Sequence, residues 1–308
     1  MYYLDYERLS HHISMLSDRT RTGAFRRAIR KTVKRGDVVV DLGTGTGIMA
    51  FFASQSGARK IYAIERTGII NLAKRLAESN GYTNIKFINS DSRHAKLPEK
   101  CDVLLSECIG YFALQENMLS DVIELRKRLL KRGGVMMPSE IELFLAPVSS
   151  PELYGKIAFW KRMYGIGFGP AMEVAANSVY QELVAPAQLI ASAARIKRID
   201  LSKDDSIKLD ETVDFTARRG GQIDSICGYF RAKLCDDVFL TNGPGTQTHW
   251  KCQLFPLNPH LRVRKGDVIR CRVRAIPHRG FVDWEWEANA QGYVSRHSTR
   301  YGARLKEL

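Results

Sequence analysis

The ten residues from Val38 to Gly47 constrain the fold of this chain more than any other stretch. Three β-branched residues lead to Asp41, three glycines then alternate with small residues, and an apolar run follows from Ile48 to Ala53. This order predicts a strand, a tight turn and a helix. Glycine permits a sharp turn and the close approach of a ligand to the backbone, and the helix beyond the turn offers free N–H groups.

A second predicted strand begins at Lys60 and ends in Glu65, where an acid suits the two hydroxyls of a ribose. A glycine-rich turn by itself also fits a βαβ unit that binds nothing. Nicotinamide-binding turns follow G-x-G-x-x-G, whereas the glycines here are two residues apart from Gly43 onward and follow Asp41. This D-x-G-x-G-x-G pattern resembles the first motif of the S-adenosylmethionine-dependent methyltransferases.

Strand and helix patterns alternate from Asp37 to Pro138, which predicts a parallel sheet with crossover helices. The expected strands are Val38–Asp41, Lys60–Glu65, Ile85–Asn89, Val103–Glu107 and Gly134–Met137, and the expected helices lie near 47–55, 68–80 and 117–131. Ligands of such sheets bind at the carboxyl ends of the strands, and this edge holds Asp41, Glu65, Asp91 to Arg93, and Glu107.

The pattern changes on either side of this alternating segment. The spacing of apolar residues in 7–34 predicts one or two amphipathic helices. After Pro138, short β-rich runs predict an antiparallel barrel or sandwich. These runs are Glu140–Val148, Ile190–Ile199, Thr212–Arg218, Ile226–Leu234, Trp250–Phe255, Val268–Ala275 and Val282–Ala288. A helical insertion at about 151–187, rich in aromatic residues, interrupts them and predicts a lid or a dimer arm.

Composition limits the environment and the partners. The 308 residues carry a net charge of +14, with nine Lys and Arg against three acids in residues 1–36 and twelve against five in residues 251–308. This excess fits a solvated surface or an acidic partner such as nucleic acid or the ribosome. No apolar run approaches a membrane span, and the start does not resemble a signal peptide. The six scattered cysteines favour free thiols in the cytoplasm and no zinc site.

Two carboxylates, Glu107 and Glu116, lie nine residues apart on the loop after the fourth predicted strand. If the loop folds back at Gly110, both can face one cavity and hold a cation. A guanidinium is planar and matches carboxylates through paired hydrogen bonds. Each glutamate alone could instead cap a helix or face solvent, but the pair beside a nucleotide-type turn favours a binding role.

The segment Ser106-Glu107-x-x-Gly-Tyr-(x)4-Glu116-x-Met118-Leu resembles the double-glutamate loop of the protein arginine methyltransferases. Thr248-His249-Trp250 resembles that family's THW loop, Met15-Leu16-x-Asp18-x-x-Arg21-Thr22 its N-terminal helix, and Tyr3-(x)2-Tyr6 its aromatic start. These motifs occur in order over nearly the whole chain. The resemblance implies an N-terminal helical segment (1–36), a Rossmann-like class I methyltransferase domain (37–138) and a β-barrel domain (139–308) whose helical arm joins two copies as a homodimer.

The resemblance also implies a role for each matching residue. S-adenosylmethionine would be bound by Tyr6, Met15, Arg21, Asp41, Gly43, Gly45, Glu65, Ser92 and Glu107, with Arg21 on its carboxylate and Glu65 on its ribose. Tyr3, Tyr6, Met118 and Trp250 would contact the substrate. Glu107 and Glu116 would hold the guanidinium, and His249 would pair with Asp18 as a proton acceptor. Met15 and Met118 match methionines that flank the guanidinium in relatives that make asymmetric dimethylarginine, which is the expected product.

The chain departs from the family's pattern at two places. Cys108-Ile109 stands where the family often has Trp-Met, and Ser92-Arg93 stands where Val-Glu commonly contacts adenine. The sequence thus predicts transfer of a methyl group to an arginine guanidinium in a protein or peptide. Free arginine, another guanidino compound or RNA remain alternative substrates on the same fold, and a non-enzymatic ribosome-binding module remains a second alternative. The intact acids and glycines argue against a pure binder.

Overall fold

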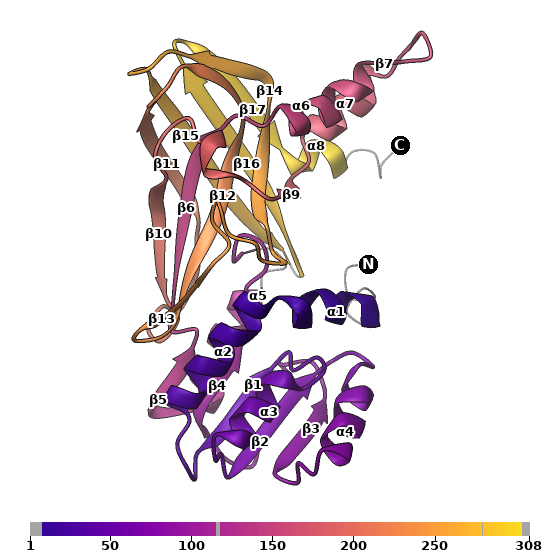
Figure 1. The fold of residues 1–308 in the computed structure, drawn as a ribbon, viewed down its shortest axis with the longest axis vertical. Helices are drawn as coiled ribbons and strands as arrows, with labels where there is room; N and C mark the ends of the chain where they lie inside the picture. Colours follow the sequence, from indigo (N-terminus) through magenta and orange to yellow (C-terminus); the bar gives the residue numbers. More distant parts are fainter. Residues whose placement is uncertain (1–7, 115–117, 279, 304–308) are drawn as a thin grey trace.

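The structure, a computed structural model, describes residues 8–114, 118–278 and 280–303. It consists of a parallel sheet with its helices and a larger antiparallel β-structure (Figure 1). Helices α1 (Leu9–Ser17) and α2 (Arg19–Thr32) lie between these two parts. No helix within the described residues has the length and apolar character needed to cross a membrane.

The parallel sheet has the strand order β3-β2-β1-β4-β5. Its strands are β1 (Val38–Leu42), β2 (Lys60–Glu65), β3 (Ile85–Asn89), β4 (Cys101–Ser106) and β5 (Leu130–Met137). All five residues of β1 are buried, as expected for a central strand that is covered on both faces. The chain winds outward from β1 to β3 and then returns to the other side of β1 as β4. The gap beyond the ends of β1 and β4 is therefore the topological switch point, where ligands bind.

The helices of this part are α3 (Ile48–Gln55), α4 (Ile70–Ser79) and α5 (Met118–Leu129). They fall within a few residues of the helices that the sequence predicts. The structure thereby confirms the doubly wound, Rossmann-like arrangement of strands and crossover helices.

All pairing between neighbouring strands beyond Pro138 that the structure describes is antiparallel. One sheet has the order β10-β6-β12-β14-β9, with β13 paired to β12, and the other has the order β11-β15-β16-β17. The strands of the first sheet are β6 (Glu140–Val148), β9 (Tyr180–Glu182), β10 (Ala194–Asp200), β12 (Gly221–Cys235), β13 (Val238–Thr241) and β14 (Cys252–Val263). Those of the second are β11 (Asp210–Thr216), β15 (Val268–His278), β16 (Phe281–Ala290) and β17 (Tyr293–Ser298), and α8 (Thr299–Ala303) follows.

The expected barrel is confirmed only as antiparallel β-structure. The two sheets approach each other where β10 meets β11 and where β14 meets β17. At these places the described strands pack together without forming a continuous ladder, so hydrogen bonding does not close the strands into one barrel. The periodicity of the sequence predicts strands and their buried faces, but it does not distinguish two packed sheets from a closed one.

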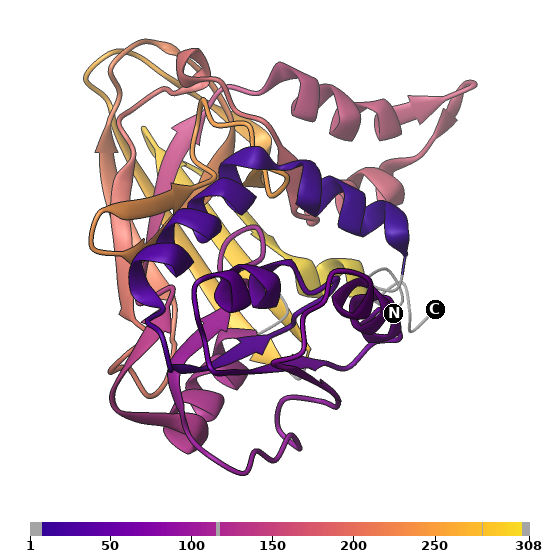
Figure 2. The same cartoon turned by 60° about the horizontal axis from the view of Figure 1, so that its bottom comes forward.

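The helical insertion projects from the β-structure (Figures 1 and 2). It contains α6 (Pro151–Ala158), a 3-10 turn (Phe159–Lys161), the short pair β7 (Arg162–Met163) and β8 (Ile166–Gly167), and α7 (Gly169–Ala176). Large apolar side chains are exposed near its tip, with Tyr164 95% and Ile166 62% exposed. An apolar surface on a projection is typical of a segment that is covered by a partner.

Helix α2 joins the two parts of the molecule. Its buried residues Ala24, Phe25, Ala28 and Ile29 recur at the spacing of one helical face. The helix contacts α3 on one side and β12 and β13 on the other. This packing fixes the first turn of α2 beside the carboxyl ends of the parallel strands (Figure 2).

Candidate active site

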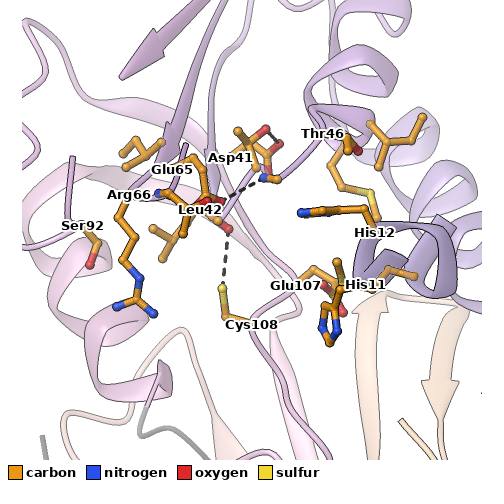
Figure 3. Close-up of a pocket in the computed structure, with 18 of the residues that line it drawn as sticks. His11, His12, Asp41, Leu42, Thr46, Glu65, Arg66, Ser92, Glu107 and Cys108 are labelled. Atoms are coloured by element: carbon orange, nitrogen blue, oxygen red, sulfur yellow. Dashed lines mark hydrogen bonds between the residues drawn. The ribbon is translucent and has the colours of Figure 1, made fainter. Parts of the chain in front are cut away.

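A cavity of about 270 Å³ lies over the carboxyl ends of β1, β2 and β4. Asp41, Glu65 and Glu107 line it from the strand ends, and His11 and His12 line it from α1 (Figure 3). The segment just before β14 completes the lining. The cavity is close to the usual size range of small-molecule sites.

Asp41 organises the glycine-rich turn. It is 2% exposed, and its Oδ2 accepts hydrogen bonds from Thr44 Oγ1 at 2.5 Å and from the backbone N–H of Ala50 at 3.1 Å. Burial raises the pKa of Asp41 to about 6, against the effect of these two hydrogen bonds. The contacts therefore give Asp41 a supporting role in the turn, and its direct contact with a cofactor stays a prediction.

The glycines of the turn are required by space as well as by conformation. Gly43 and Gly45 have φ values of +70° and +53°. A Cβ atom on Gly43 would lie 2.8 Å from Sγ of Cys108, and one on Gly45 would lie 3.1 Å from the imidazole of His12. Any side chain would thus disturb the neighbours that line the cavity.

Glu65 at the end of β2 is held in place by three donors. Its Oε2 accepts from the backbone N–H of Gly45 at 3.1 Å, and its Oε1 accepts from the N–H and hydroxyl of Thr67, both at 2.9 Å. Each carboxylate oxygen accepts up to about two hydrogen bonds, so Oε1 is fully used and Oε2 retains capacity for a ribose hydroxyl.

Arg21 and Glu107 meet inside the cavity. Nη2 of Arg21 lies 2.7 Å from Oε2 of Glu107, and the two side chains are only 6% and 17% exposed. Burial opposes the charge of Arg21, but Glu107, Asp18 and Asp41 outweigh it and raise the pKa of the guanidinium. Nη1 of Arg21 also donates to the Met15 carbonyl at 3.1 Å. Its Nε is buried and has no hydrogen-bond partner among the described residues.

Asp18 connects the N-terminal helices to the β-structure. Its Oδ1 accepts from the N–H of Arg21 at 2.9 Å and so caps α2. Its Oδ2 accepts from the backbone N–H of His249 at 2.9 Å and lies 3.0 Å from Nδ1 of the same residue. Burial alone would raise the pKa of Asp18, but these hydrogen bonds outweigh it and the pKa is lowered. The carboxylate favours a proton on Nδ1, which leaves Nε2 of a neutral imidazole as an acceptor.

The loop that carries Glu107 is anchored in the β-structure. Ile109 and Phe112 are 1% and 0% exposed, and the Phe112 ring packs against Phe255 and Trp284 with centroids 5.8 and 5.6 Å apart. Gly228 on β12 leaves room for this ring, since a Cβ there would lie 3.0 Å from Phe112. Glu107 is therefore positioned by packing between the two sheets.

The structure brings most of the residues expected at the site to one cavity. These are Met15, Arg21, Asp41, Gly43, Gly45, Glu65, Ser92, Glu107, His249 and Trp250, with Asp18 directly behind His249. Trp250 is only 3% exposed and packs edge-on against Phe230, so it is more buried than a residue at the mouth of a channel. Tyr3, Tyr6 and Glu116 lie outside the described residues, and so does the side chain of Met118. Their roles, and the expected product, stay predictions.

Sequence reasoning missed several residues that line the cavity. They are His11, His12, Thr44, Thr46, Ile48, Met49, Ile64, Arg66, Thr67, Ser90, Cys108, Tyr111 and Asp121, together with neighbouring residues of the same segments. Helical spacing from Met15 would have indicated His11 and His12, which lie four and three residues before it. Asp121 had no comparable signal in the sequence. In the described residues, no three His, Cys, Asp or Glu side chains are grouped as metal ligands would be, and all six cysteines are free.

Comparison with known proteins supports the family resemblance that the sequence motifs indicate. A methyltransferase-domain family matches residues 33–200, and the arginine methyltransferase oligomerization subdomain matches residues 140–289. The chain is 30% identical to protein arginine N-methyltransferase 6 of Xenopus tropicalis over 293 residues, which cover 90% of this chain and 86% of that protein. The chain belongs to the protein arginine N-methyltransferase family.

Two solved structures of this family have the same fold. Protein arginine methyltransferase 10 of Arabidopsis thaliana superimposes with a TM-score of 0.83 at 27% identity, covering 97% of this chain and 100% of that chain. A chain of the Trypanosoma brucei PRMT1 enzyme-prozyme complex with AdoHcy superimposes with a TM-score of 0.88 at 23% identity, covering 95% and 99%. The chain is an S-adenosylmethionine-dependent arginine methyltransferase, and its cofactor is S-adenosylmethionine.

The residues of the cavity fit this cofactor. Oε2 of Glu65 presents an acceptor suited to a ribose hydroxyl. The buried Nε of Arg21, which has no hydrogen-bond partner in the part of the chain that the structure describes, suits a carboxylate. Gly43 and Gly45 both line the cavity, and Gly43 is exposed there, so a ligand can approach its backbone closely. The cavity of this arginine methyltransferase thus has polar groups that match the ribose and the carboxylate of the cofactor.

Proposed function

We propose that this methyltransferase acts on an arginine guanidinium in a protein or peptide, held by Glu107 and Glu116. The ion pair between Arg21 and Glu107 carries the proposal. A guanidinium lies against Oε2 of Glu107 in this pair, and both side chains are largely buried. Oε1 of Glu107 would hold the guanidinium of the substrate.

The bound cofactor supplies an electrophilic methyl group on a sulfonium. Arg21 and Glu65 would orient it, so that the guanidinium nitrogen approaches in line, and positioning accounts for most of the rate enhancement. Glu107 would localise the guanidinium charge away from the attacking nitrogen. A free guanidinium has a pKa above about 12, so its proton leaves during or after transfer. Nε2 of His249, whose tautomer Asp18 fixes, is one acceptor, and the two glutamates are the others.

The substrate class is tested by transfer of labelled methyl groups. We expect label in an arginine-containing peptide and none in the same peptide with lysine in place of arginine. Free arginine and RNA serve as the competing substrates, and the family relationship does not favour them. Label that enters only RNA or only free arginine would contradict the proposal.

The functional unit that we propose is a homodimer with the division 1–36, 37–138 and 139–308 and with residues 151–187 as the arm. The exposed Tyr164 and Ile166 at the tip of the arm support it, as does the match to an oligomerization subdomain. The six free thiols support a reducing, cytoplasmic location. Cell fractionation of the tagged protein tests the cytoplasmic location. Recovery of the protein from an oxidising compartment would contradict that location.

The basic surface supports contact with an acidic partner, including nucleic acid, mainly along α2. Arg26, Arg27 and Arg30 of α2 are exposed, and so is Lys34 just after the helix. In the C-terminal segment, by contrast, the basic charge of β15 and β17 is paired across the sheet, as in Arg270–Asp214, Arg272–Asp210 and Arg296–Glu287. Fluorescence anisotropy with a labelled single-stranded RNA tests this contact. Absence of binding at low salt would contradict it.

A further inference from the structure

One end of the cavity lies beyond Glu65, on the side of the sheet where β3 ends. Arg66 and Ser92 line this end (Figure 3), together with Asp91 after β3 and Asp121 in the first turn of α5. If Glu65 binds the ribose, the base of the cofactor extends past it in this direction. The groups at this end therefore determine which base is accepted.

Two charged side chains of the loop after β3 pair with each other. Nε and Nη2 of Arg93 donate to the two oxygens of Asp91 at 2.8 and 2.6 Å, and this pairing holds the pKa of Asp91 well below its usual range. Arg128 donates to the carbonyls of Ser92 and Arg93, both at 2.6 Å. Arg93 occupies the position where a glutamate is common in relatives, but a guanidinium cannot accept a hydrogen bond. The usual acceptor for an amino group is thus missing from this position.

Asp121 offers a carboxylate at the same end. Its side chain is partly buried, and no described residue forms a hydrogen bond or ion pair with it. Burial raises the pKa of Asp121, while Arg93 and Arg66 oppose the rise and Asp91 and Glu124 add to it. A partly desolvated carboxylate without a donor costs free energy, which a donor on a ligand would recover.

We propose that Asp121 recognises the adenine base of the cofactor, with its carboxylate accepting a hydrogen bond from the exocyclic 6-amino group. This inference rests on the proposed placement of the cofactor in the cavity. Asp121 reaches the cavity from α5, whereas the family's glutamate follows β3. A base with an oxygen at position 6 would place two acceptors against each other, so the carboxylate also excludes 6-oxo purines.

The test compares two ligands and four proteins by isothermal titration. The ligands are S-adenosylhomocysteine and its analogue with unsubstituted purine, which lacks only the 6-amino group. The proteins are the wild type, Asp121→Ala, Asp121→Asn and Glu124→Ala. Glu124 is the matched control because it lies one turn further along α5, is exposed and does not line the cavity, so its loss removes a nearby charge alone.

We expect the wild type and Glu124→Ala to bind the adenine ligand roughly 10- to 100-fold more tightly than the purine ligand, as for one hydrogen bond to a charged group. Asp121→Ala should reduce this preference to about threefold or less, on the same scale of energies. Asp121→Asn has nearly the same size and keeps a neutral acceptor, so its preference for the adenine ligand should fall between those of the wild type and Asp121→Ala. This variant also provides the test if Asp121→Ala does not fold.

Wild-type preference retained in both Asp121 variants, or no preference in the wild type, would overturn the inference while leaving methyl transfer intact. A wild type that binds neither ligand would instead contradict the proposed cofactor site.

Discussion

Arg21 and Glu107 form an ion pair inside the cavity, with Nη2 and Oε2 2.7 Å apart. Replacing Arg21 with alanine removes both the proposed carboxylate anchor and the partner of Glu107. We expect Arg21→Ala to weaken the binding of S-adenosylhomocysteine by about 1.5–3 kcal/mol, the usual range for a charged hydrogen bond. Isothermal titration measures this change. Arg19→Ala, an exposed residue of the same helix, is the control.

An unchanged dissociation constant for Arg21→Ala would remove this arginine from the cofactor site. A loss of the same size in Arg19→Ala would indicate that the whole helix, and not one contact, is responsible.

The raised pKa of Asp41 predicts that the stability of the fold depends on pH. Its pKa is about 6 in the folded chain and near 3.8 in the unfolded chain. Between these values the folded state binds more protons than the unfolded state, so stability falls as the pH rises. The loss of stability from ionising the buried Asp41 is absent below about pH 4 and complete above about pH 6, where it approaches 3 kcal/mol. Asp41→Asn does not titrate and is therefore free of this cost.

Urea unfolding of the wild type and of Asp41→Asn at pH 4 and pH 7 tests this prediction. We expect the stability of the wild type, relative to the variant, to be lower at pH 7 than at pH 4. The same difference at both pH values would mean that Asp41 titrates normally.

Individual residues differ in how far the sequence could predict them. Asp41 and Glu65 follow from their places at strand ends, and the pairing of Asp18 with His249, 231 residues apart, was implied only by the family resemblance. The direct pairing of Arg21 with Glu107 was not predicted, although both residues were expected to bind the cofactor. Such a contact depends on the angle at which α2 crosses the sheet, which no local pattern encodes.

At the scale of elements, the loop after β4 depends on the fit of Phe112 between the two sheets. Gly228→Ala would place a methyl group 3.0 Å from the Phe112 ring and 3.1 Å from the Phe255 ring. We expect a loss of about 1–3 kcal/mol in stability from this overpacking, together with lower turnover because the ring positions the loop of Glu107. Thermal unfolding and a rate assay measure the two effects.

Gly155→Ala is the matched control, because Gly155 lies in α6 and a Cβ there meets no atom within 4 Å. We expect it to leave stability unchanged or to raise it by up to about 1 kcal/mol. Wild-type stability and turnover in Gly228→Ala would show that the loop does not depend on this packing.

The sequence predicted most elements because their hydrophobic periods are strong. The bounds of β2 and β6 agree with the predicted strands, and the core of β12 was found although the strand is longer. The short β13 and the polar β17 were missed, since neither has a sustained alternation of apolar and polar residues. Asp121, at the charged end of the cavity, was missed for a different reason. Asp121 belongs to a helix that looks amphipathic in sequence, and its exposure to the cavity is set by the docking of α5.

At the scale of the molecule, the projecting arm predicts self-association. Tyr164 and Ile166 are exposed at its tip, and an apolar projection is stabilised when a second copy covers it. We expect the double variant Tyr164→Asn, Ile166→Ser to shift the protein from dimer to monomer at micromolar concentration in analytical ultracentrifugation. Asparagine suits the positive φ of Tyr164, so the turn itself should persist.

Val268→Ser is the control for the arm, because Val268 is an exposed apolar residue on β15, outside the insertion. A wild type that sediments as a monomer with full activity would contradict the dimer.

The proposed methyl transfer to arginine depends on Glu107 holding the substrate guanidinium. The most direct measurement is labelled methyl transfer to an arginine peptide by the wild type and by Glu107→Gln, with the dissociation constant of S-adenosylhomocysteine measured for both. Losing the charge of a buried ion pair costs about 3–5 kcal/mol, so we predict a fall of roughly two to four decades in rate with cofactor affinity nearly unchanged. Turnover by Glu107→Gln close to that of the wild type would contradict the account.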